Sequence, residues 1–287
     1  MIDSEAPVQN SGRKLFYGLF IFPLMIAVGM AVLLCTVVLL TREVETPESL
    51  ITAIKTGAPS KRWQKAFELS NELNRDPSMI RSESIMKEIV HILSAAQDYD
   101  PRTRSYMAMA LARFEGREPA EALTAALRTE ENEDVQFYLL WALGVKGYAP
   151  AGELIESFLA SSKEDLRKMA AYVLGAMGRV ESVPKLLPLL DDEAREVRWN
   201  TALSLARLGS DAGRAEILKM LDRRWLRGEG LAADRIEEIM INAVKGFALL
   251  KSEDRQVVED LSRHDESLKV RQAALEVLAQ LKTEGNS

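Results

Sequence analysis

The longest uninterrupted apolar stretch of the chain lies close to its N-terminus. Residues 15–40 contain no charged side chain, and they are flanked by Arg13, Lys14, Arg42 and Glu43. As an α-helix this stretch would be about 39 Å long, which exceeds the roughly 30 Å of a bilayer's hydrocarbon core. The pattern therefore predicts one transmembrane helix over residues 15–40, and with it a single-pass protein of the cell membrane that contacts the lipid bilayer through this segment.

Two features distinguish this segment from a cleaved signal peptide. A signal peptide has an apolar region of about 7 to 15 residues and a small-residue cleavage site. The present run is longer, and Val38-Leu39-Leu40-Thr41 offers no such site. Cys35, the only cysteine, lies inside the run, so no intramolecular disulfide can form. The adjoining Arg13 and Lys14 favour an N-terminus inside and a large domain outside, because basic residues near a span stay on the inner side.

Beyond the apolar run, one helical pattern recurs along the chain. It is clearest in Leu166–Gly178, where apolar and small residues fall roughly 0, 4, 5 and 8 positions after the start, on one face of an α-helix. Copies begin at positions 61, 103, 135, 166, 197, 239 and 270. Further helical stretches lie between them: Ala120–Leu127, Gly152–Leu159, Val183–Leu190, Arg214–Leu221 and Gln256–Ser262. Each unit is therefore predicted to be a helix pair, and stacked pairs form an α-solenoid.

Acidic residues precede most copies of the pattern. Five positions before the start stand Asp98, Glu130, Asp192, Asp234 and Asp265. Acids are favourable near a helix N-terminus, where the helix dipole is positive and amide groups lack partners. The acids are therefore interpreted as parts of helix starts.

The pattern resembles the HEAT repeat, in the short form of the phycobilisome-lyase-like HEAT families, over about residues 60–282. The resemblance implies a solenoid in which the arginine at the second position of each copy pairs with acids of neighbouring units. The copies with this arginine contain Arg62, Arg104, Arg167, Arg198 and Arg271. Gln136 and Met240 depart from the pattern, so a continuous ladder of such pairs is not expected.

These patterns together define the expected organisation of the chain. The fold class is all-α, with a transmembrane helix followed by a solenoid of about seven HEAT-like helix pairs. The expected parts are a tail (1–14), the transmembrane helix (15–40), a juxtamembrane helix and linker (41–60), the repeat domain (61–282) and a frayed C-terminus (283–287).

Composition narrows the function. Hydrophobic residues make up 47% of the chain and aromatic residues only 6%, which favours closely packed helices over strands. The net charge of −6 argues against general nucleic-acid binding, because proteins that follow a phosphate backbone are usually basic.

No arrangement of residues typical of catalysis or metal binding is present in the sequence. His91 and His264 lie in different units, and neither has a partner at metal-ligand spacing. Phosphate-binding glycine loops and nucleophile motifs are also missing. We therefore expect no enzyme activity, no catalytic residue, no cofactor, no metal ion and no small-molecule substrate.

Two copies are followed by about eleven extra residues, within Asp76–Ala96 and near Asp222–Gly230. Insertions in repeat proteins often lie on a binding face. The candidate partner-binding residues in the second insertion are Arg223, Arg224, Trp225 and Arg227. Arginine and tryptophan are enriched in interaction hot spots. In the alternative interpretation, Trp225 packs on the flank of the solenoid and the arginines are solvated.

The leading hypothesis is a membrane-tethered scaffold or adaptor that binds a membrane or envelope protein complex through its solenoid surface. The resemblance implies an alternative, a bilin-lyase-like enzyme or chromophore chaperone. A third possibility is a structural spacer whose membrane helix self-associates through Ala27 and Ala31, a pair of small residues one helical turn apart.

Overall fold

The computed structural model describes residues 16–40, 46–75, 81–250 and 255–284, in two units that divide between Thr46 and Pro47. All regular secondary structure in these residues is helical, which confirms the all-α fold class. The predicted tail, Arg42, Glu43 and the last three residues of the chain lie outside the described residues.

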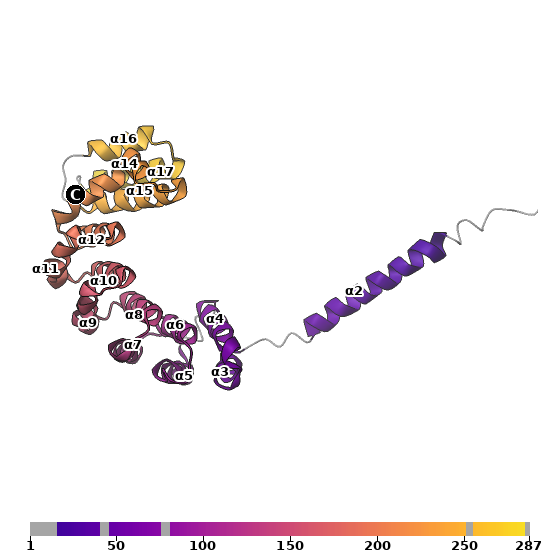
Figure 1. Cartoon of the computed structure of the whole chain (residues 1–287). Coiled ribbons are helices and arrows are strands. Elements are labelled where there is room, and N and C mark those ends of the chain that lie inside the picture. Colours follow the sequence, from indigo (N-terminus) through magenta and orange to yellow (C-terminus); the bar gives the residue numbers. More distant parts are fainter. Residues whose placement is uncertain (1–15, 41–45, 76–80, 251–254, 285–287) are drawn as a thin grey trace, which may run out of the picture. The chain divides into compact units, whose positions relative to one another are not determined.

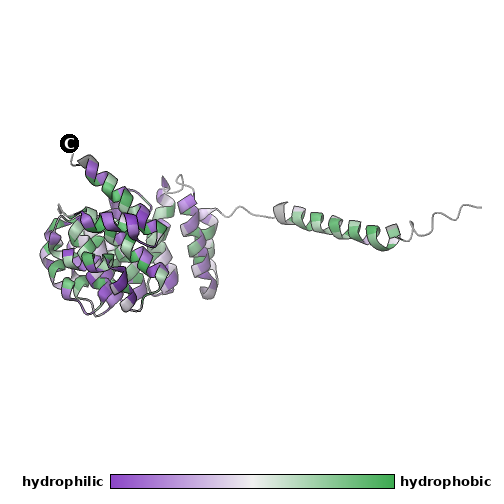
Figure 2. Ribbon diagram, turned by 90° about the horizontal axis from the view of Figure 1, so that it is seen from above, coloured by the Kyte–Doolittle hydropathy of each residue, from purple (hydrophilic) through white to green (hydrophobic). Residues whose placement is uncertain are grey.

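The first unit is one apolar helix. A π-helical turn, η1 (Tyr17–Ile21), leads into α2 (Phe22–Leu40), and Pro23 is the second residue of α2. Proline has no backbone N–H to donate to the preceding turn, and a wider turn of this kind is one way in which a helix accommodates it. Gly18–Val37 is long and apolar enough to cross a membrane, and none of it is buried. Hydrophobic residues follow one another along this helix in Figure 2.

The second unit is a curved, two-layered array of helices (Figure 1). The inner side of the curve is formed by α4 (Pro59–Arg75), α6 (Pro101–Leu111), α8 (Glu133–Lys146), α10 (Glu164–Ala176) and α12 (Arg195–Arg207). The series continues in α15 (Ala233–Ala248) and α17 (Leu268–Glu284). Each of these seven helices contains one predicted repeat start, so the register read from the sequence is confirmed in the part of the chain that the structure describes.

The outer layer holds the connecting helices. These are α3 (Pro47–Thr56), α5 (Glu83–Ser94), α7 (Arg117–Thr129), α9 (Gly152–Ser157), α11 (Val183–Leu186), α13 (Arg214–Leu221) and α16 (Gln256–His264). Short 3-10 turns extend three of these helices. Turns η3 (Ala149–Ala151) and η4 (Phe158–Ala160) flank α9, and turns η5 (Val180–Ser182) and η6 (Leu187–Asp191) flank α11. Turn η7 (Asp211–Gly213) precedes α13. Pro184 and Pro188 account for the broken helix around α11, because neither supplies a backbone N–H.

Each insertion contributes a helix within the residues that the structure describes. In the first, α5 buries Ile85, Ile89 and Ile92, as their helical spacing predicts. In the second, the short helix α14 (Arg223–Gly228) buries Leu226. The array also begins before the first repeat start, because α3 packs against α4 and α5 and buries Leu50, Ile51 and Ile54.

The buried face of the inner helices follows the repeat. In the copies that start at 103, 135, 166, 197 and 239, the residues 0, 4, 5 and 8 positions after the start are all buried. The resulting core has two clusters that meet at α12, where Val197 belongs to one and Trp199 to the other. Each unit therefore buries its apolar face against its neighbours, as in other solenoids.

Two glycines of α10 and its C-terminal end serve close packing (Gly175) and the end of the helix (Gly178). A Cβ atom on Gly175 would lie 2.5 Å from the Cβ of Ser204, so its absence lets α10 and α12 approach closely. Gly178 has a φ of 68°, a left-handed conformation that ends a helix without strain only when the residue has no side chain.

Candidate interaction surface

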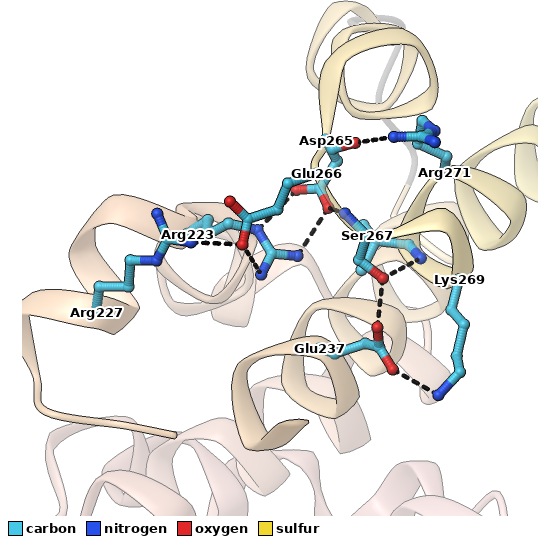
Figure 3. A network of polar contacts seen from close by, with 9 residues as sticks. Arg223, Arg227, Glu237, Asp265, Glu266, Ser267, Lys269 and Arg271 are labelled. Carbon is cyan, nitrogen blue, oxygen red and sulfur yellow. Dashed lines mark hydrogen bonds and ion pairs between the residues drawn. The ribbon is translucent and has the colours of Figure 1, made fainter. Parts of the chain in front are cut away.

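The cluster predicted from the second insertion is built on α14. Asp222 caps this helix by accepting hydrogen bonds from the backbone N–H groups of Arg224 and Trp225, at 2.9 and 3.0 Å. Arg223 reaches across to the turn before α17, where Nη2 and Nε donate to the two carboxylate oxygens of Asp265, at 2.7 and 3.0 Å (Figure 3). The side chains of Arg223 and Asp265 are only 12% and 3% exposed. This pair therefore belongs to the interior of the array.

The other members of the cluster differ in their surroundings. Trp225 is half-buried and meets Trp199 edge to face, with ring centroids 6.3 Å apart. Arg227 is exposed and pairs with Glu266. Arg224 is exposed, and its side chain has no ion pair or hydrogen bond within the described residues. The structure thus gives internal contacts to three of the four candidate residues and leaves Arg224 open to a partner.

The arginines at the second repeat position bind the turns of the array. Each donates to a backbone carbonyl in the turn before its own helix; the acceptors belong to Gly57, Tyr99, Ser161, Asp192 and Asp265. Arg104 and Arg167 also pair with the carboxylates of Glu130 and Asp192 in the next unit. The Arg167 guanidinium, despite the opposing effect of burial, lowers the pKa of the Asp192 carboxyl. These pairs are the contacts between units that the family resemblance implies.

The insertion supplies one such contact where the repeat lacks it. The sixth copy has Met240 in place of the arginine, so its second repeat position offers no cation to Asp265. Arg223, which comes from α14, makes the same pair of hydrogen bonds to Asp265 that Arg167 makes to Asp192, through Nε and Nη2. The sequence analysis treated Arg223 as a surface residue. The spacing of the repeat cannot show that an arginine of the insertion takes the place of the missing repeat arginine.

A second buried carboxylate joins two outer helices. Glu156 of α9 is 4% exposed at its side chain and accepts hydrogen bonds from Arg179, Ser182 and Lys185. Burial alone would raise the pKa of this carboxyl, but the hydrogen bonds from Lys185, Ser182 and Arg179 outweigh it and lower the pKa to about 2. Glu156 is therefore an anion that holds the next unit in place.

The inner helices carry a row of large, partly exposed side chains on the concave side. The residues six positions after five successive repeat starts form this concave row: Phe67, Met109, Trp141, Tyr172 and Leu203. At 100° per residue they lie on the side of each helix opposite the buried face, and thus face away from the outer layer. Phe67 and Tyr172 are 46% and 40% exposed, and the other three are half-buried.

Contacts between neighbouring helices join the concave row to aromatic residues beside it. Tyr106 and Tyr138 stand three positions after their repeat starts, and Tyr106 meets Phe67 edge to face with centroids 5.4 Å apart. The Arg207 guanidinium lies over the Tyr172 ring, 5.4 Å from its centroid. The sequence analysis did not identify this surface, and Trp141 in fact has two roles, because it is half-buried and packs against the core as well. The sequence does contain a pattern that indicates this surface. The position six residues after the repeat start lies outside the core face, and it holds a large apolar residue in five successive copies.

The two histidines of the described chain lie in separate units of the array. No group of three or more histidine, cysteine, aspartate or glutamate residues there is placed to hold a metal ion. His91 is exposed on α5, and His264 is exposed beside Asp260 at the end of α16.

The chain is similar to known proteins in part of its sequence and in its fold. Residues 151–229 match the family model for HEAT repeats. One solved structure of similar fold is the complex of CpcE and CpcF of phycocyanin lyase from Nostoc sp. PCC7120, with a TM-score of 0.53, 16% identity, and coverage of 84% of this chain and 96% of that one. An engineered protein from a structural genomics consortium has a TM-score of 0.45 and 17% identity, with coverage of 83% of this chain and 96% of that one. No curated protein matches the chain.

Proposed function

We propose that this chain is a membrane-tethered scaffold that binds another protein on the concave side of its helical array. The observation that carries the proposal is the concave row, which presents exposed or half-buried apolar side chains on five successive inner helices. Single exposed apolar residues are common on soluble proteins, whereas a contiguous group of them marks an interaction site. Aromatic residues and methionine, which make up most of this row, are also enriched in protein interfaces.

The tether in this proposal is the apolar helix that ends at Leu40. The sequence leaves six residues, 41–46, between this helix and α3, which can span at most about 20 Å when fully extended. Such a short connection restricts the domain to partners at or in the same membrane. Arg13 and Lys14 support an orientation with the N-terminus inside and the repeat domain outside.

The proposal is tested by site-specific photo-crosslinking of the full chain in native membranes. A photoreactive phenylalanine analogue replaces Tyr172 of the concave row, and in a matched control it replaces Leu187 of the outer layer, which is also 40% exposed. We expect a discrete crosslinked protein from position 172 and none from position 187. Equal yields from the two positions, or no product from position 172, would contradict a binding site on the concave side.

The membrane tether is tested in the same preparation. The chain should remain in the membrane pellet after a high-salt or alkaline wash, and its N-terminus should still be present in the mature protein. Release by the wash, or a mature chain that begins after Leu40, would identify residues 15–40 as a cleaved signal sequence.

A second candidate function follows from the fold likeness to the phycocyanin lyase complex. At 16% identity this likeness supports the fold, and it motivates a test for chromophore attachment rather than an assignment. The full chain would be incubated with a bilin and an acceptor phycobiliprotein. Covalent transfer of the bilin would favour the lyase function over the scaffold.

A further inference from the structure

The side of an inner helix that meets the following unit is marked by small residues. Nine positions after the repeat start, Gly144 and Gly175 lie very close to the next inner helix. A Cβ atom there would be 2.8 Å from Cγ2 of Val173 and 2.5 Å from Cβ of Ser204. The corresponding residue of the last inner helix, α17, is Ala279, which is exposed. The side of α17 that matches an internal interface is therefore open.

This open side of α17 is apolar. The residue five positions after the repeat start is fully buried in the six preceding copies, whereas in α17 it is Leu275, which is 52% exposed. Leu268, two turns earlier on the same side of the helix, is 73% exposed. Ala279 lies one turn after Leu275 and extends the same stripe. The stripe thus has the composition of a contact surface.

The other end of the array is polar. Seven positions after the repeat start, Val173 and Ser204 contact the preceding inner helix. On the first inner helix, α4, this position holds Glu68, and beside it on the same side stand the exposed residues Gln64 and Asn71. Solubility of repeat proteins requires terminal units with a polar outer face. The first unit has such a face and the last described unit lacks it, so head-to-tail stacking of copies would press polar residues onto leucines.

The charges beside the leucines are complementary to those of a second copy of α17. Lys269 and Glu276 follow Leu268 and Leu275 directly, and both line a shallow hollow between α15 and α17. Both are exposed. Lys269 pairs with Glu237 of α15 at 2.7 Å (Figure 3), and its ammonium has further donors. Glu276 has no ion pair in the part of the chain that the structure describes. One flank of the helix therefore carries opposite charges two turns apart.

We propose that two copies of this chain associate through their α17 helices, packed antiparallel about a two-fold axis near Gln272. Leu268 of each copy then lies beside Leu275 of the other. Lys269 of each copy likewise lies beside Glu276 of the other, whereas parallel packing would place like charges together. A two-fold contact uses the same surface twice and closes after two copies. The dimer covers both apolar stripes, and it requires no partner at the concave row.

Disulfide crosslinking of the full chain in isolated membranes tests the dimer. Cys35→Ala removes the only native thiol, and Gln272→Cys then places a single cysteine near the proposed axis. The matched control is Gln64→Cys, at an exposed glutamine of the polar end. Because a disulfide needs Cβ atoms about 4 Å apart, mild oxidation should join two Gln272→Cys chains and no Gln64→Cys chains. No dimer from position 272, or equal yields from the two positions, would overturn the proposal.

Two differently tagged copies test the antiparallel direction. One copy carries Lys269→Cys and the other Glu276→Cys, both with Cys35→Ala. The mixed disulfide should exceed either homodimer by at least about fivefold, since only the two different positions lie within disulfide distance. A product made mainly of homodimers would contradict the antiparallel arrangement.

Substitutions of the stripe test whether the leucines form the contact. Leu268→Gln with Leu275→Gln should lower the yield of the Gln272→Cys dimer by about tenfold, because apolar anchors supply much of the binding free energy at an interface. The control is Val145→Gln with Val180→Gln, which removes two exposed apolar residues elsewhere in the array. Circular dichroism of the purified chains verifies folding. An unchanged yield from the leucine variant, or an equal loss in the control, would show that α17 is not the contact.

The same membranes separate this proposal from the proposed function. The partner crosslink from position 172 should be retained in the leucine variant, because Leu268 and Leu275 are not part of the concave row. Retention of that crosslink without any dimer from position 272 in the otherwise native chain would remove the dimer and leave the scaffold. A dimer from position 272 without a crosslink from position 172 would support the dimer and contradict the concave binding site.

Discussion

Arg223 donates hydrogen bonds to both carboxylate oxygens of Asp265, although helices α15 and α16 separate the two residues along the chain. Arg223 comes from the insertion that interrupts the repeat, and Asp265 precedes the last inner helix. The pair joins the sixth and seventh units, just as the ion pair of Arg167 and Asp192 joins the fourth and fifth units. The insertion is thus a structural part of the array, which changes what its arginines are expected to do.

The first prediction separates Arg223 from its neighbour. Arg223→Ala should lower the free energy of unfolding by about 3 kcal/mol or more, because Asp265 would stay buried without its cation. Arg224→Ala, a matched change at the next residue, should alter it by no more than about 0.5 kcal/mol, since that side chain is exposed. Urea unfolding followed by circular dichroism measures both. Equal effects of the two variants would show that the ion pair is not formed in solution.

The second prediction concerns Glu156 and acid. The pKa of this carboxyl is lowered from 4.5 to about 2 in the folded chain. Its ion pairs therefore stabilise the fold fully above about pH 5, and this contribution is lost as the pH falls from there towards 2. The shift corresponds to about 3 kcal/mol, of which roughly 2 kcal/mol is lost by pH 3.

Urea unfolding of three proteins at pH 6 and pH 3 measures this effect. Glu156→Gln should be less stable than the wild type at pH 6, and its stability should fall by about 2 kcal/mol less on acidification. Glu153→Gln, at an exposed position of the same helix, should follow the wild type. If the Glu156→Gln and wild-type stabilities fall in parallel, the carboxyl does not have the lowered pKa.

The third prediction tests the close approach of α10 and α12. A Cβ on Gly175 would lie 2.5 Å from Ser204 Cβ and 2.7 Å from its Cα, so the two helices would have to separate. Gly175→Ala should destabilise the domain by about 1 to 3 kcal/mol, despite the higher helix propensity of alanine. Gly228→Ala is the control, because no heavy atom lies within 4 Å of a Cβ there. A thermal melt in which both variants match the wild type would show that the interface is looser.

The fourth prediction addresses the buried face of the best-formed repeat. Leu174 of α10 is fully buried, and Leu174→Asp would place a carboxylate there without a partner. The free energy of unfolding should fall by at least about 3 kcal/mol. Val180→Asp, at a position that is 58% exposed, should have little effect. Unchanged stability of the Leu174→Asp variant would mean that the wrong helical face had been assigned.

Much of the fold could be predicted from the sequence because the repeat supplies the same information several times. The start at Leu166 lies two residues inside α10, and the predicted outer stretch Arg214–Leu221 coincides with α13. Such patterns depend on local helix geometry and on the burial of one face, both of which recur in each unit.

The polar contacts and the candidate surface were harder to predict for physical reasons. The Arg223–Asp265 pair depends on how α14 folds back on the array, which no local spacing determines. Trp141 is half-buried and packs against the core, and the exposed part of its side chain depends on the absence of a third layer of helices, which local spacing does not show. The concave row could have been predicted by looking for an apolar residue that recurs at the same non-core position of each repeat. Trp141 and Tyr172 are two such residues.

The contact of each unit with only its neighbours also determines how the array would bear a mechanical load. In a single copy of the proposed membrane-tethered scaffold, if a partner held at the α12 end of the concave row is pulled away from the membrane, the force passes in series through the inner helices from α12 back to α4, then through α3 to the N-terminal apolar helix. The units from α13 to α17 lie beyond this point of attachment and carry none of it. They could unfold and refold while the partner stays anchored, whereas failure of any unit between α3 and α12 would lengthen the tether.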